Sequence, residues 1–289
     1  MSKLSIVILS YNTKNLTLVC LKSIVYRYKS ELQKKEFEII VVDNNSSDSS
    51  VYCIKDYIAS IKYEGIINLI QSEENLGFAK GCNLGARFAK GKYLLFLNSD
   101  TQVLDKGFIK MVQFLEENPK VAILGGKLKN INGSLQNSVG KFYNLFNLFF
   151  MLLGKDNRQS PKDIAGVDWV SGACLMIRKD VFNRIKGFDG HLFMYMEDME
   201  LCYNARKSGF FTYFYPDVSV VHQELGSSNR AFAIKNIYKG ILYFYRKHRN
   251  YEYGLAKFML VIKATVAIAI GSLSGNSNLK TTYQEALKF

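Results

Sequence analysis

Cysteine is scarce in this 289-residue chain, and none of its five cysteines forms a CxxC pair with another. Because their number is odd and they are scattered, neither a disulfide framework nor a structural zinc site is indicated. We expect reduced, buried thiols at all five positions. They are Cys20, Cys53, Cys82, Cys174 and Cys202.

Several other features are missing from the sequence. It contains neither a GxGxxG nor a GxxxxGK[ST] motif, so the two commonest phosphate-binding loops are absent. The first apolar run, "LSIVIL", is too short for a secretory signal, and a cytoplasmic protein is expected. The apolar run at residues 142–154 is shorter than the roughly 20 residues of a membrane span. We expect a flexible or interfacial loop there.

The chain carries 38 Lys and Arg residues against 25 Asp and Glu residues, a formal net charge of +13. This excess predicts an anionic partner, which could be a phosphate-bearing substrate, an acidic lipid or a nucleic acid. Hydrophobic residues make up 48% of the sequence, which is enough for a sizeable core in one or two domains.

Short apolar runs alternate with helix-like stretches, a pattern typical of βαβ units. It predicts an α/β fold with a mostly parallel, Rossmann-like sheet flanked by helices. The expected strands cover residues 4–10, 37–43, 66–72, 93–100 and 121–126, with two short strands around Pro216. The expected helices cover residues 15–32, 79–89 and 105–118.

Polar side chains follow the expected strands where each strand ends. Ligands of open parallel sheets bind beyond the carboxyl ends of the strands, so we expect these side chains to meet at one site. They are Tyr11, Asn12, Asp43, Asn44, Asn98, Ser99 and Asp100.

Asp43 lies in the segment "VVDNNSSDSS". It could simply belong to a turn, or its carboxylate could accept a hydrogen bond from a nucleobase imide or a ribose hydroxyl. The strand end "YLLFLNSD" offers the Asp100 carboxylate to a divalent cation, which typically binds one or two carboxylates together with substrate phosphates. A simple strand-end turn explains Asp100 equally well.

The segment "NLGFAKGCNLG", residues 75–85, places a glycine at every fourth position. One interpretation is a helix start that packs closely against the sheet. The other is a backbone that approaches a nucleotide near Asn75 and Gly77, with Lys80 available to the nucleotide's charge.

The segment "MYMEDMELCYNARKSG", residues 194–209, gathers three carboxylates within four positions of a basic chain. Asp198 could cap the helix that starts here, with Glu200 favoured in its first turn by the helix dipole. Alternatively, Glu197, Asp198 and Glu200 belong to a catalytic site.

Residues 230–263 contain eight Lys or Arg residues and one acid, Glu252, interleaved with tyrosines and a phenylalanine. Basic helices with aromatic side chains suit an anionic membrane surface. The apolar stretch at 255–273 is interrupted by Lys257 and Lys263, and we expect it to lie on the bilayer or dip into it. A core helix or a dimer interface explains it equally well.

Seven segments, in this order, resemble the inverting glycosyltransferases of family 2, and within them the bacterial rhamnosyltransferase-like branch. They are "SIVILSYN", "EIIVVDNNSSD", "ENLGFAKGCNLG", "YLLFLNSD", "WVSGACLMIRKDVFNRIKGFD", "FMYMEDMELCYNARKSGF" and "VVHQELGSS". The resemblance covers about residues 3–230 and implies the GT-A fold. The last part of the chain lies outside it.

The resemblance implies a site for a nucleoside diphosphate sugar. Asp43 would bind the base or ribose, and Tyr11 and Asn12 would line the same pocket, with Asn75, Gly77 and Lys80 beside it. The Asn98, Ser99 and Asp100 triplet stands where the family has its DxD metal motif, with Asn98 in place of the first acid. Asp100 would then be the main carboxylate for Mg²⁺ or Mn²⁺, and His222 could contact the metal or the diphosphate.

The resemblance also implies how the acceptor is activated. Asp198 would be the general base that takes the proton of the attacking hydroxyl, in a single displacement that inverts the anomeric carbon. Glu197 and Glu200 would orient or bind the acceptor. Trp169, the only tryptophan, would pack against the acceptor or the sugar, and a core tryptophan is an equal alternative.

The sequence therefore predicts a catalytic domain at residues 1–229, with a nucleotide-binding half at 1–126 and an acceptor half at 127–229. Residues 230–289 are predicted to form a helical extension that associates with a membrane or forms a homodimer. The predicted activity is metal-assisted transfer of a sugar, rhamnose being one candidate, to a glycan or lipid-linked acceptor of a bacterial surface polysaccharide. The predicted location is the cytoplasmic face of the cell membrane.

Two other functions are compatible with parts of the sequence. A nucleotidyltransferase would carry a glycine-rich basic loop after the first strand, but "SYNTKN" contains no glycine. A non-enzymatic module that binds an anionic surface or a nucleic acid would spread its basic residues over one face. Because the basic excess is concentrated after residue 230, we expect no nucleic-acid partner.

Overall fold

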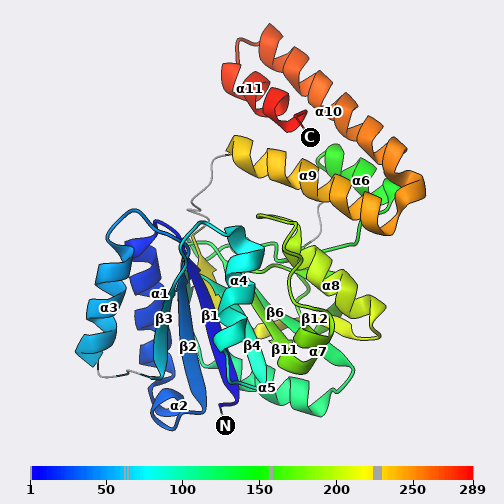
Figure 1. Cartoon of the computed structure of the whole chain (residues 1–289). Coiled ribbons are helices and arrows are strands. Elements are labelled where there is room, and N and C mark those ends of the chain that lie inside the picture. The colour runs from blue at the N-terminus through cyan, green and yellow to red at the C-terminus, as the bar shows by residue number, and fades with distance from the viewer. Residues whose placement is uncertain (1, 62, 64, 156–158, 224–229, 289) are drawn as a thin grey trace.

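The computed structural model describes residues 2–288, apart from positions 62, 64, 156–158 and 224–229. Its centre is a twisted sheet with helices on both faces, and a group of helices from the end of the chain lies over one edge of this unit (Figure 1). The expected α/β architecture with a mostly parallel sheet is confirmed.

The first half of the sheet is wholly parallel and follows the order β3-β2-β1-β4. These strands are β1 (Leu4–Ser10), β2 (Phe37–Asp43), β3 (Ile67–Gln71) and β4 (Tyr93–Asn98). The order then continues as β11-β6-β12-β5, in which β11 is antiparallel to both of its neighbours. These strands are β11 (Cys174–Arg178), β6 (Val121–Lys129), β12 (Phe211–His222) and β5 (Thr101–Val103).

Four short strands complete the β-structure of the described residues. β7 (Leu135–Gln136) pairs with β6, and β9 (Ala165–Val167) pairs with β12. β8 (Val139–Gly140) and β10 (Trp169–Val170) form a separate antiparallel pair that holds Trp169.

Alternation along β1 assigns its side chains to two hydrophobic layers. Leu4, Ile6 and Ile8 pack against the layer that contains α1 (Lys14–Arg27), α2 (Lys29–Gln33), α3 (Ser50–Ile61) and α5 (Gly107–Glu117). Val7 packs on the opposite layer, with α4 (Gly77–Phe88), α7 (Lys179–Arg184) and α8 (Glu197–Lys207). β1, β2 and β4 are buried on both faces, which explains their nearly continuous apolar sequences.

The single helix expected at residues 15–32 is wrong, because the chain breaks it at Tyr28 into α1 and α2. The Tyr28 ring is fully buried, and its hydroxyl donates to the carbonyl of Asp105 and accepts from the N–H of Phe108. Through these two hydrogen bonds, the buried Tyr28 hydroxyl fixes the break between α1 and α2 next to the start of α5.

The expected loop at residues 142–154 is also wrong over most of its length, since α6 (Leu145–Leu152) is a helix. Asn144 caps it by accepting a hydrogen bond from the N–H of Asn147 at 2.8 Å. Leu148 and Leu152 are buried against the C-terminal helices. The two strands expected around Pro216 are one strand, β12, whose register shifts between Tyr215 and Ser219. This irregularity accommodates a proline within a strand.

The C-terminal helices are α9 (Arg230–His248), α10 (Tyr253–Leu273) and α11 (Ser277–Ala286), with the short 3₁₀ helix η1 (Asn250–Glu252) between the first two. They enclose a third hydrophobic cluster with α6, and Met199 of α8 is buried in it. The α/β unit and the C-terminal helices therefore share a core.

Within the described part of the chain, Asn250–Leu273 is the one helical stretch long and apolar enough to cross a membrane, and 28% of an apolar 18-residue window within it is buried. The inner face of α10 packs Ala256, Leu260 and Ala264 into the third cluster. Its outer face exposes a row of large apolar side chains at helical spacing, Leu255, Phe258, Ile262, Val266 and Ile270.

Candidate active site

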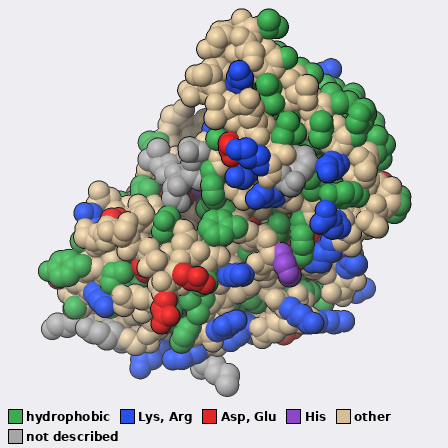
Figure 2. All heavy atoms as spheres, turned by 45° about the horizontal axis from the view of Figure 1, so that its top comes forward, with side chains coloured by type: hydrophobic (Ala, Val, Ile, Leu, Met, Phe, Trp, Pro, Cys, Tyr) green, Lys and Arg blue, Asp and Glu red, His purple; other side chains and the backbone are tan. Residues whose placement is uncertain are grey.

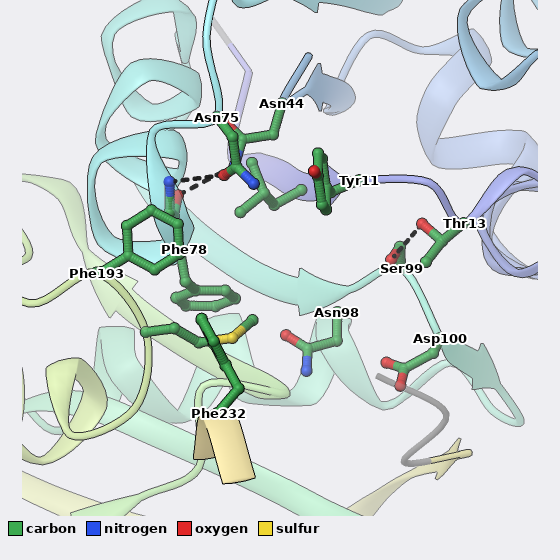
Figure 3. A pocket seen from close by; sticks show the side chains of 13 residues that line it. Tyr11, Thr13, Asn44, Asn75, Phe78, Asn98, Ser99, Asp100, Phe193 and Phe232 are labelled. Carbon is green, nitrogen blue, oxygen red and sulfur yellow. Dashed lines mark hydrogen bonds between the residues drawn. The ribbon is translucent and has the colours of Figure 1, made fainter. Parts of the chain in front are cut away.

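The carboxyl ends of β1, β2 and β4 border a cavity of about 330 Å³, here called the strand-end cavity (Figure 3). Six of the predicted donor-site residues line it: Tyr11, Asn75, Gly77, Asn98, Ser99 and Asp100. Three aromatic side chains, Phe78, Phe193 and Phe232, close another side, and Phe232 enters from α9. The parallel strands have thus placed polar groups from distant segments around one space.

Asn44, one of the polar strand-end residues expected to meet at one site, also lines this cavity, although no specific role was predicted for it. Its amide nitrogen donates to Asn75 Oδ1 at 2.9 Å, and its amide oxygen accepts from the N–H of Leu76 at 3.0 Å. Asn44 therefore connects the end of β2 to the glycine-containing start of α4.

Gly77 begins α4 with φ of +74°, a conformation that favours glycine. A Cβ atom at this position would lie 2.3 Å from the carbonyl oxygen of Phe193, which accepts from the N–H of Phe78 at 2.6 Å. The requirement for glycine thus comes from close backbone contact with residues 193–194, which line the cavity.

Asp43, Asn12 and Lys80 are not among the residues that line the strand-end cavity. Asp43 is 2% exposed; its Oδ2 accepts from the N–H of Ser46, and its Oδ1 is buried without a partner among the described residues. Asn12, at φ of +53°, accepts from the N–H groups of Ser47 and Asp48. Both side chains organise the turn after β2.

Lys80 is exposed on α4, and its aliphatic chain packs against Gly190. The structure therefore does not bring its ammonium group together with the other predicted donor-site residues.

A second cavity of about 320 Å³ adjoins the first and is called the α8 cavity. Phe78, Asn98 and Met194 line both cavities, so they have a common wall. The α8 cavity brings together four predicted residues, Trp169, Glu197, Asp198 and His222.

Asp198 lies in the first turn of α8, which begins at Glu197, so Met196 rather than Asp198 occupies the capping position. Its Oδ2 accepts from the N–H of Gly172 at 3.1 Å, and its Oδ1 accepts from the N–H of Met199 at 2.7 Å. Burial raises the pKa of Asp198, and the backbone N–H groups oppose this effect without cancelling it. A carboxylate with a raised pKa is a stronger proton acceptor.

The backbone just before this carboxylate is strained. Tyr195 and Met196 are consecutive non-glycine residues in the left-handed region, with φ of +68° and +71°. Such conformations cost free energy and persist where the surrounding structure imposes them, often at functional sites.

Glu197 is buried, and its Oε2 has no hydrogen-bond partner among the described residues. Burial raises its pKa well above the ordinary value, and the negative charge of Asp198 raises it further. Two adjacent buried carboxyl groups do not both ionise readily, and Asp198 has the backbone N–H groups that favour its charged form. These directions make Glu197 the member of the pair that keeps its proton more readily and Asp198 the member that ionises more readily.

Glu200 points away from both cavities. Its side chain is 1% exposed, and it accepts hydrogen bonds from Lys247 at 2.7 Å and from His248 at 2.9 Å. Burial alone would raise its pKa, but the bonds from His248 and Lys247 outweigh burial and lower it. The structure thus gives Glu200 a place between α8 and α9, where it cannot contact an acceptor in the α8 cavity.

Trp169 lies on the wall of the α8 cavity and is half-buried. Its indole N–H donates to the carbonyl of Lys141 at 3.1 Å. Its ring lies against Gly140, where a Cβ atom would come within 2.2 Å of the indole. This position combines core packing with one exposed face in the cavity.

Asp100, Asn98 and His222 meet where the two cavities adjoin. His222 Nε2 lies 3.4 Å from Asp100 Oδ1 and 3.3 Å from the amide nitrogen of Asn98. Asn98 Oδ1 is buried and has no partner among the described residues. Oxygen and imidazole donors of this kind suit Mg²⁺ or Mn²⁺.

Gln136 orients the histidine ring. Its amide nitrogen donates to Asn130 Oδ1 and to the carbonyl of His222, so its Oε1 faces His222 Nδ1, at 3.0 Å, as an acceptor. His222 Nδ1 must then carry the proton, which in the neutral ring leaves the Nε2 lone pair directed at Asp100. No motif could have identified the contact between Gln136 and His222, because Gln136 lies on β7, outside the seven segments that resemble the family.

Among the described residues, no group of three or more His, Cys, Asp or Glu side chains could hold a metal by itself. Asp100 and His222 are two donors, which fits a cation that takes its remaining ligands from a substrate diphosphate and water. The arrangement can hold a divalent cation only jointly with an anionic ligand in the strand-end cavity.

Comparison with known proteins points to one family. Residues 5–186 match the model of glycosyl transferase family 2. The chain is 29% identical over 204 residues to a low-salt glycan biosynthesis hexosyltransferase of Haloferax volcanii, covering 65% of this chain and 62% of the relative. It is 27% identical over 223 residues to the Escherichia coli rhamnosyltransferase WbbL, covering 70% of this chain and 78% of the relative.

A poly(ribitol-phosphate) β-glucosyltransferase of Bacillus spizizenii is 36% identical over 131 residues. This match covers 45% of our chain, and the chain spans only 20% of that relative's length.

Solved structures agree with the fold. The chain superposes on GalNAc-T7, crystallised with UDP, GalNAc and Mn²⁺, with a TM-score of 0.66 at 17% identity, covering 99% of this chain and 54% of that one. It superposes on a mannosyltransferase of Pyrobaculum calidifontis, in complex with GDP-mannose and Mn²⁺, with a TM-score of 0.62 at 14% identity, covering 99% and 85%.

Proposed function

Because the chain belongs to glycosyl transferase family 2 and has the GT-A fold of these solved structures, we propose that it moves one sugar from a nucleoside diphosphate to a glycan acceptor. The acceptor is a lipid-linked oligosaccharide in bacterial surface polysaccharide synthesis. The observation that carries this proposal is the pair of adjoining cavities, one beside Asp100 and the other beside Asp198.

The donor occupies the strand-end cavity. Asp43 does not line this cavity, but its buried Oδ1 has no partner among the described residues, and this unused acceptor supports a contact with the base or ribose at the turn after β2. Tyr11, Asn75 and Gly77 line the space for the rest of the nucleotide, and Ser99 holds the wall through its bond to Thr13 at 3.1 Å. Asn12 and Lys80 lie outside this space, so we assign them no direct contact.

Asp100 and His222 would hold Mg²⁺ or Mn²⁺, with Asn98 beside them. When bound, the cation would supply positive charge that stabilises the departing diphosphate. Gln136 is uncharged and accepts a hydrogen bond from His222 Nδ1, which keeps His222 Nε2 available to the cation.

Asp198 acts as the general base. An acceptor hydroxyl in the α8 cavity attacks the anomeric carbon while the bond from that carbon to the diphosphate oxygen breaks, and the hydroxyl proton passes to Asp198. A single displacement of this kind inverts the anomeric centre. Glu197 stays protonated beside the base, and Trp169 offers its exposed face to the acceptor sugar.

The names of two relatives favour rhamnose as the sugar that this chain transfers. One is WbbL, and the other is an N-acetylglucosaminyl-diphospho-decaprenol L-rhamnosyltransferase of Mycobacterium tuberculosis, 23% identical over 221 residues and covering 68% of this chain and 70% of the relative. The name of the second relative also describes an acceptor that is a lipid diphosphate. We place the protein at the cytoplasmic face of the membrane, where the apolar row of α10 would contact the bilayer; a homodimer through α10 is the alternative use of that row.

A panel of nucleotide sugars tests the function. In the presence of Mn²⁺, the correct donor should stabilise the chain against heat and should be hydrolysed slowly to free nucleoside diphosphate. Pyrophosphate exchange without nucleoside diphosphate release would instead identify a nucleotidyltransferase. No thermal shift with any nucleotide would favour a non-enzymatic binding module.

A further inference from the structure

A third cavity, of about 480 Å³, lies between α9, α10 and residues 191–194. We call it the α9–α10 cavity. No Asp or Glu is among its described lining residues, whereas three cationic side chains are. Its polar lining consists chiefly of Asn236, Lys239, Tyr243, Arg246, Tyr253 and Lys257. A cavity of this composition is complementary to an anion with more than one negative charge.

Contacts within the cavity wall order its cationic groups. The Arg246 guanidinium lies 4.9 Å from the centre of the Tyr253 ring and donates to the Tyr253 hydroxyl at 2.8 Å. The Asp189 carboxylate contacts the lining residues His191 and Tyr243, at 2.8 and 2.7 Å, and also accepts from Lys247 at 2.5 Å. Although burial alone would raise the pKa of Asp189, these bonds lower it, so the acid is ionised and paired. Lys247, which does not line the cavity, pairs with both Asp189 and Glu200.

The α9–α10 cavity adjoins the proposed reaction site. Phe193 and Met194 line both this cavity and the strand-end cavity, and Met194 also lines the α8 cavity beside Asp198. A group held by the cations is therefore separated from the base by one segment of chain. The α8 cavity is thus a neighbouring space for the first sugar attached to such a group.

The α9–α10 cavity also adjoins the apolar row of α10. Lys257 lines the cavity, and the next residue, Phe258, is 59% exposed and belongs to the apolar row that continues through Ile262 and Val266. Figure 2 shows hydrophobic side chains and Lys or Arg side chains next to one another over the C-terminal helices. An anion with a long apolar chain would satisfy both surfaces at once.

We propose that the α9–α10 cavity binds the diphosphate of the lipid-linked acceptor, with the lipid leaving along the outer face of α10. This assignment rests on the proposed glycosyl transfer, because it is the acceptor sugar that must reach Asp198. It adds a binding site for the lipid diphosphate that is separate from the donor diphosphate site beside Asp100.

Calorimetric binding of geranylgeranyl diphosphate to the full chain, in neutral detergent, tests the assignment. The double variant Arg246→Gln, Lys257→Gln should bind this probe at least tenfold more weakly. Lys263→Gln, Lys280→Gln removes the same charge from α10 and α11 outside the cavity, and should bind within twofold of the native chain. The single variant Lys239→Gln changes an exposed side chain of the cavity and should weaken geranylgeranyl diphosphate binding severalfold. It replaces the double variant as the test if the double variant does not fold.

Three further probes identify the source of the phosphate. Geranylgeraniol, which lacks phosphate, should bind the native chain and the cavity variants equally. A nucleoside diphosphate with Mn²⁺ should bind all of them equally; weaker nucleotide binding by the cavity variants would assign the cavity to the donor and overturn the proposal. Vesicles containing phosphatidylglycerol should not substitute for the probe, and a defect confined to vesicle binding would assign the cavity to phospholipid headgroups.

Unchanged binding of geranylgeranyl diphosphate by folded cavity variants also overturns the proposal. Failure of the proposed function is seen separately, as failure of the native chain to bind any nucleoside diphosphate with Mn²⁺. Asp100→Asn should lose that nucleotide binding and keep geranylgeranyl diphosphate binding, which distinguishes the two sites.

Discussion

His222 Nε2 lies 3.4 Å from Asp100 Oδ1, although the two residues belong to the end of β12 and the turn after β4. The antiparallel pairing of β12 with β5 brings them together, since His222 is paired with Thr101. The cation site proposed here therefore depends on the edge of the sheet as much as on the strand-end motif.

Asp198→Asn should lower the rate of sugar transfer by about 10²–10⁴-fold while nucleotide binding is retained, because it removes the general base but keeps the shape of the side chain. Glu197→Gln should keep most of the activity, because the raised pKa of Glu197 already favours its neutral form. Transfer rates and nucleotide affinities of both variants check the assignment. A large loss in Glu197→Gln with a small loss in Asp198→Asn would reverse the two roles.

The pH dependence of kcat/KM reports the ionisation of the Asp198 carboxylate. Activity requires ionised Asp198, so the rate should rise with pH, and the raised pKa places this rise at higher pH than for an ordinary aspartate with a pKa of 3.8. Glu197→Gln should leave the position of the acid limb nearly unchanged. Circular dichroism at each pH separates titration from unfolding, and a rate that stays constant down to pH near 3.8 would contradict the prediction.

Gln136→Leu should weaken Mn²⁺ binding by roughly 10–100-fold in the presence of nucleoside diphosphate, because His222 loses the acceptor that fixes its ring. Electron paramagnetic resonance of free Mn²⁺ measures this without any turnover. Gln113→Leu, an exposed change on α5, is the control and should leave Mn²⁺ binding as it is. Equal Mn²⁺ affinity in both variants would show that the Gln136 contact is dispensable.

Glu200→Gln should lower the free energy of unfolding at pH 7 by on the order of 3 kcal/mol, since it removes the partner of a buried histidine. The folded-state pKa of Glu200 is lowered, so its contribution is present above the unfolded-state pKa and disappears as pH falls through the folded-state value. Denaturant unfolding at pH 7 and at progressively lower pH checks both statements. Glu36→Gln, in an exposed pair with Lys3, should cost less than about 1 kcal/mol.

Phe258→Asp, Ile262→Asp should reduce binding to lipid vesicles at least tenfold, because burying one such side chain is worth about 1.5–3 kcal/mol. Both side chains are exposed, so thermal stability should change little. Ile131→Asp, at another exposed apolar position, should bind vesicles normally. If the double variant instead dissociates a dimer and binds vesicles as before, the row on α10 is a subunit interface.

The parallel half of the sheet was predictable because its strands are buried on both faces, which leaves continuous apolar runs such as "FEIIVVD" in the sequence. The helix breaks were less predictable. In the sequence, Tyr28 resembles any aromatic residue within a helix. In the structure α1 ends at this residue, where the Tyr28 hydroxyl contacts Asp105 and Phe108. The α6 helix was missed because its apolar pattern matches a short interfacial segment equally well.

For the site, the sequence by itself determined which polar residues follow the strands, because chain order and strand ends are local properties. It also supplied the family resemblance. Only the tertiary structure decided that Asp198 lines a cavity while Glu200 faces His248, since both lie in the first turn of one helix and differ in which neighbour buries them. The tertiary structure also decided that Gln136 contacts His222 and that the cationic side chains of α9 line a cavity. Contacts between elements that are distant in the chain leave no signal in any single segment.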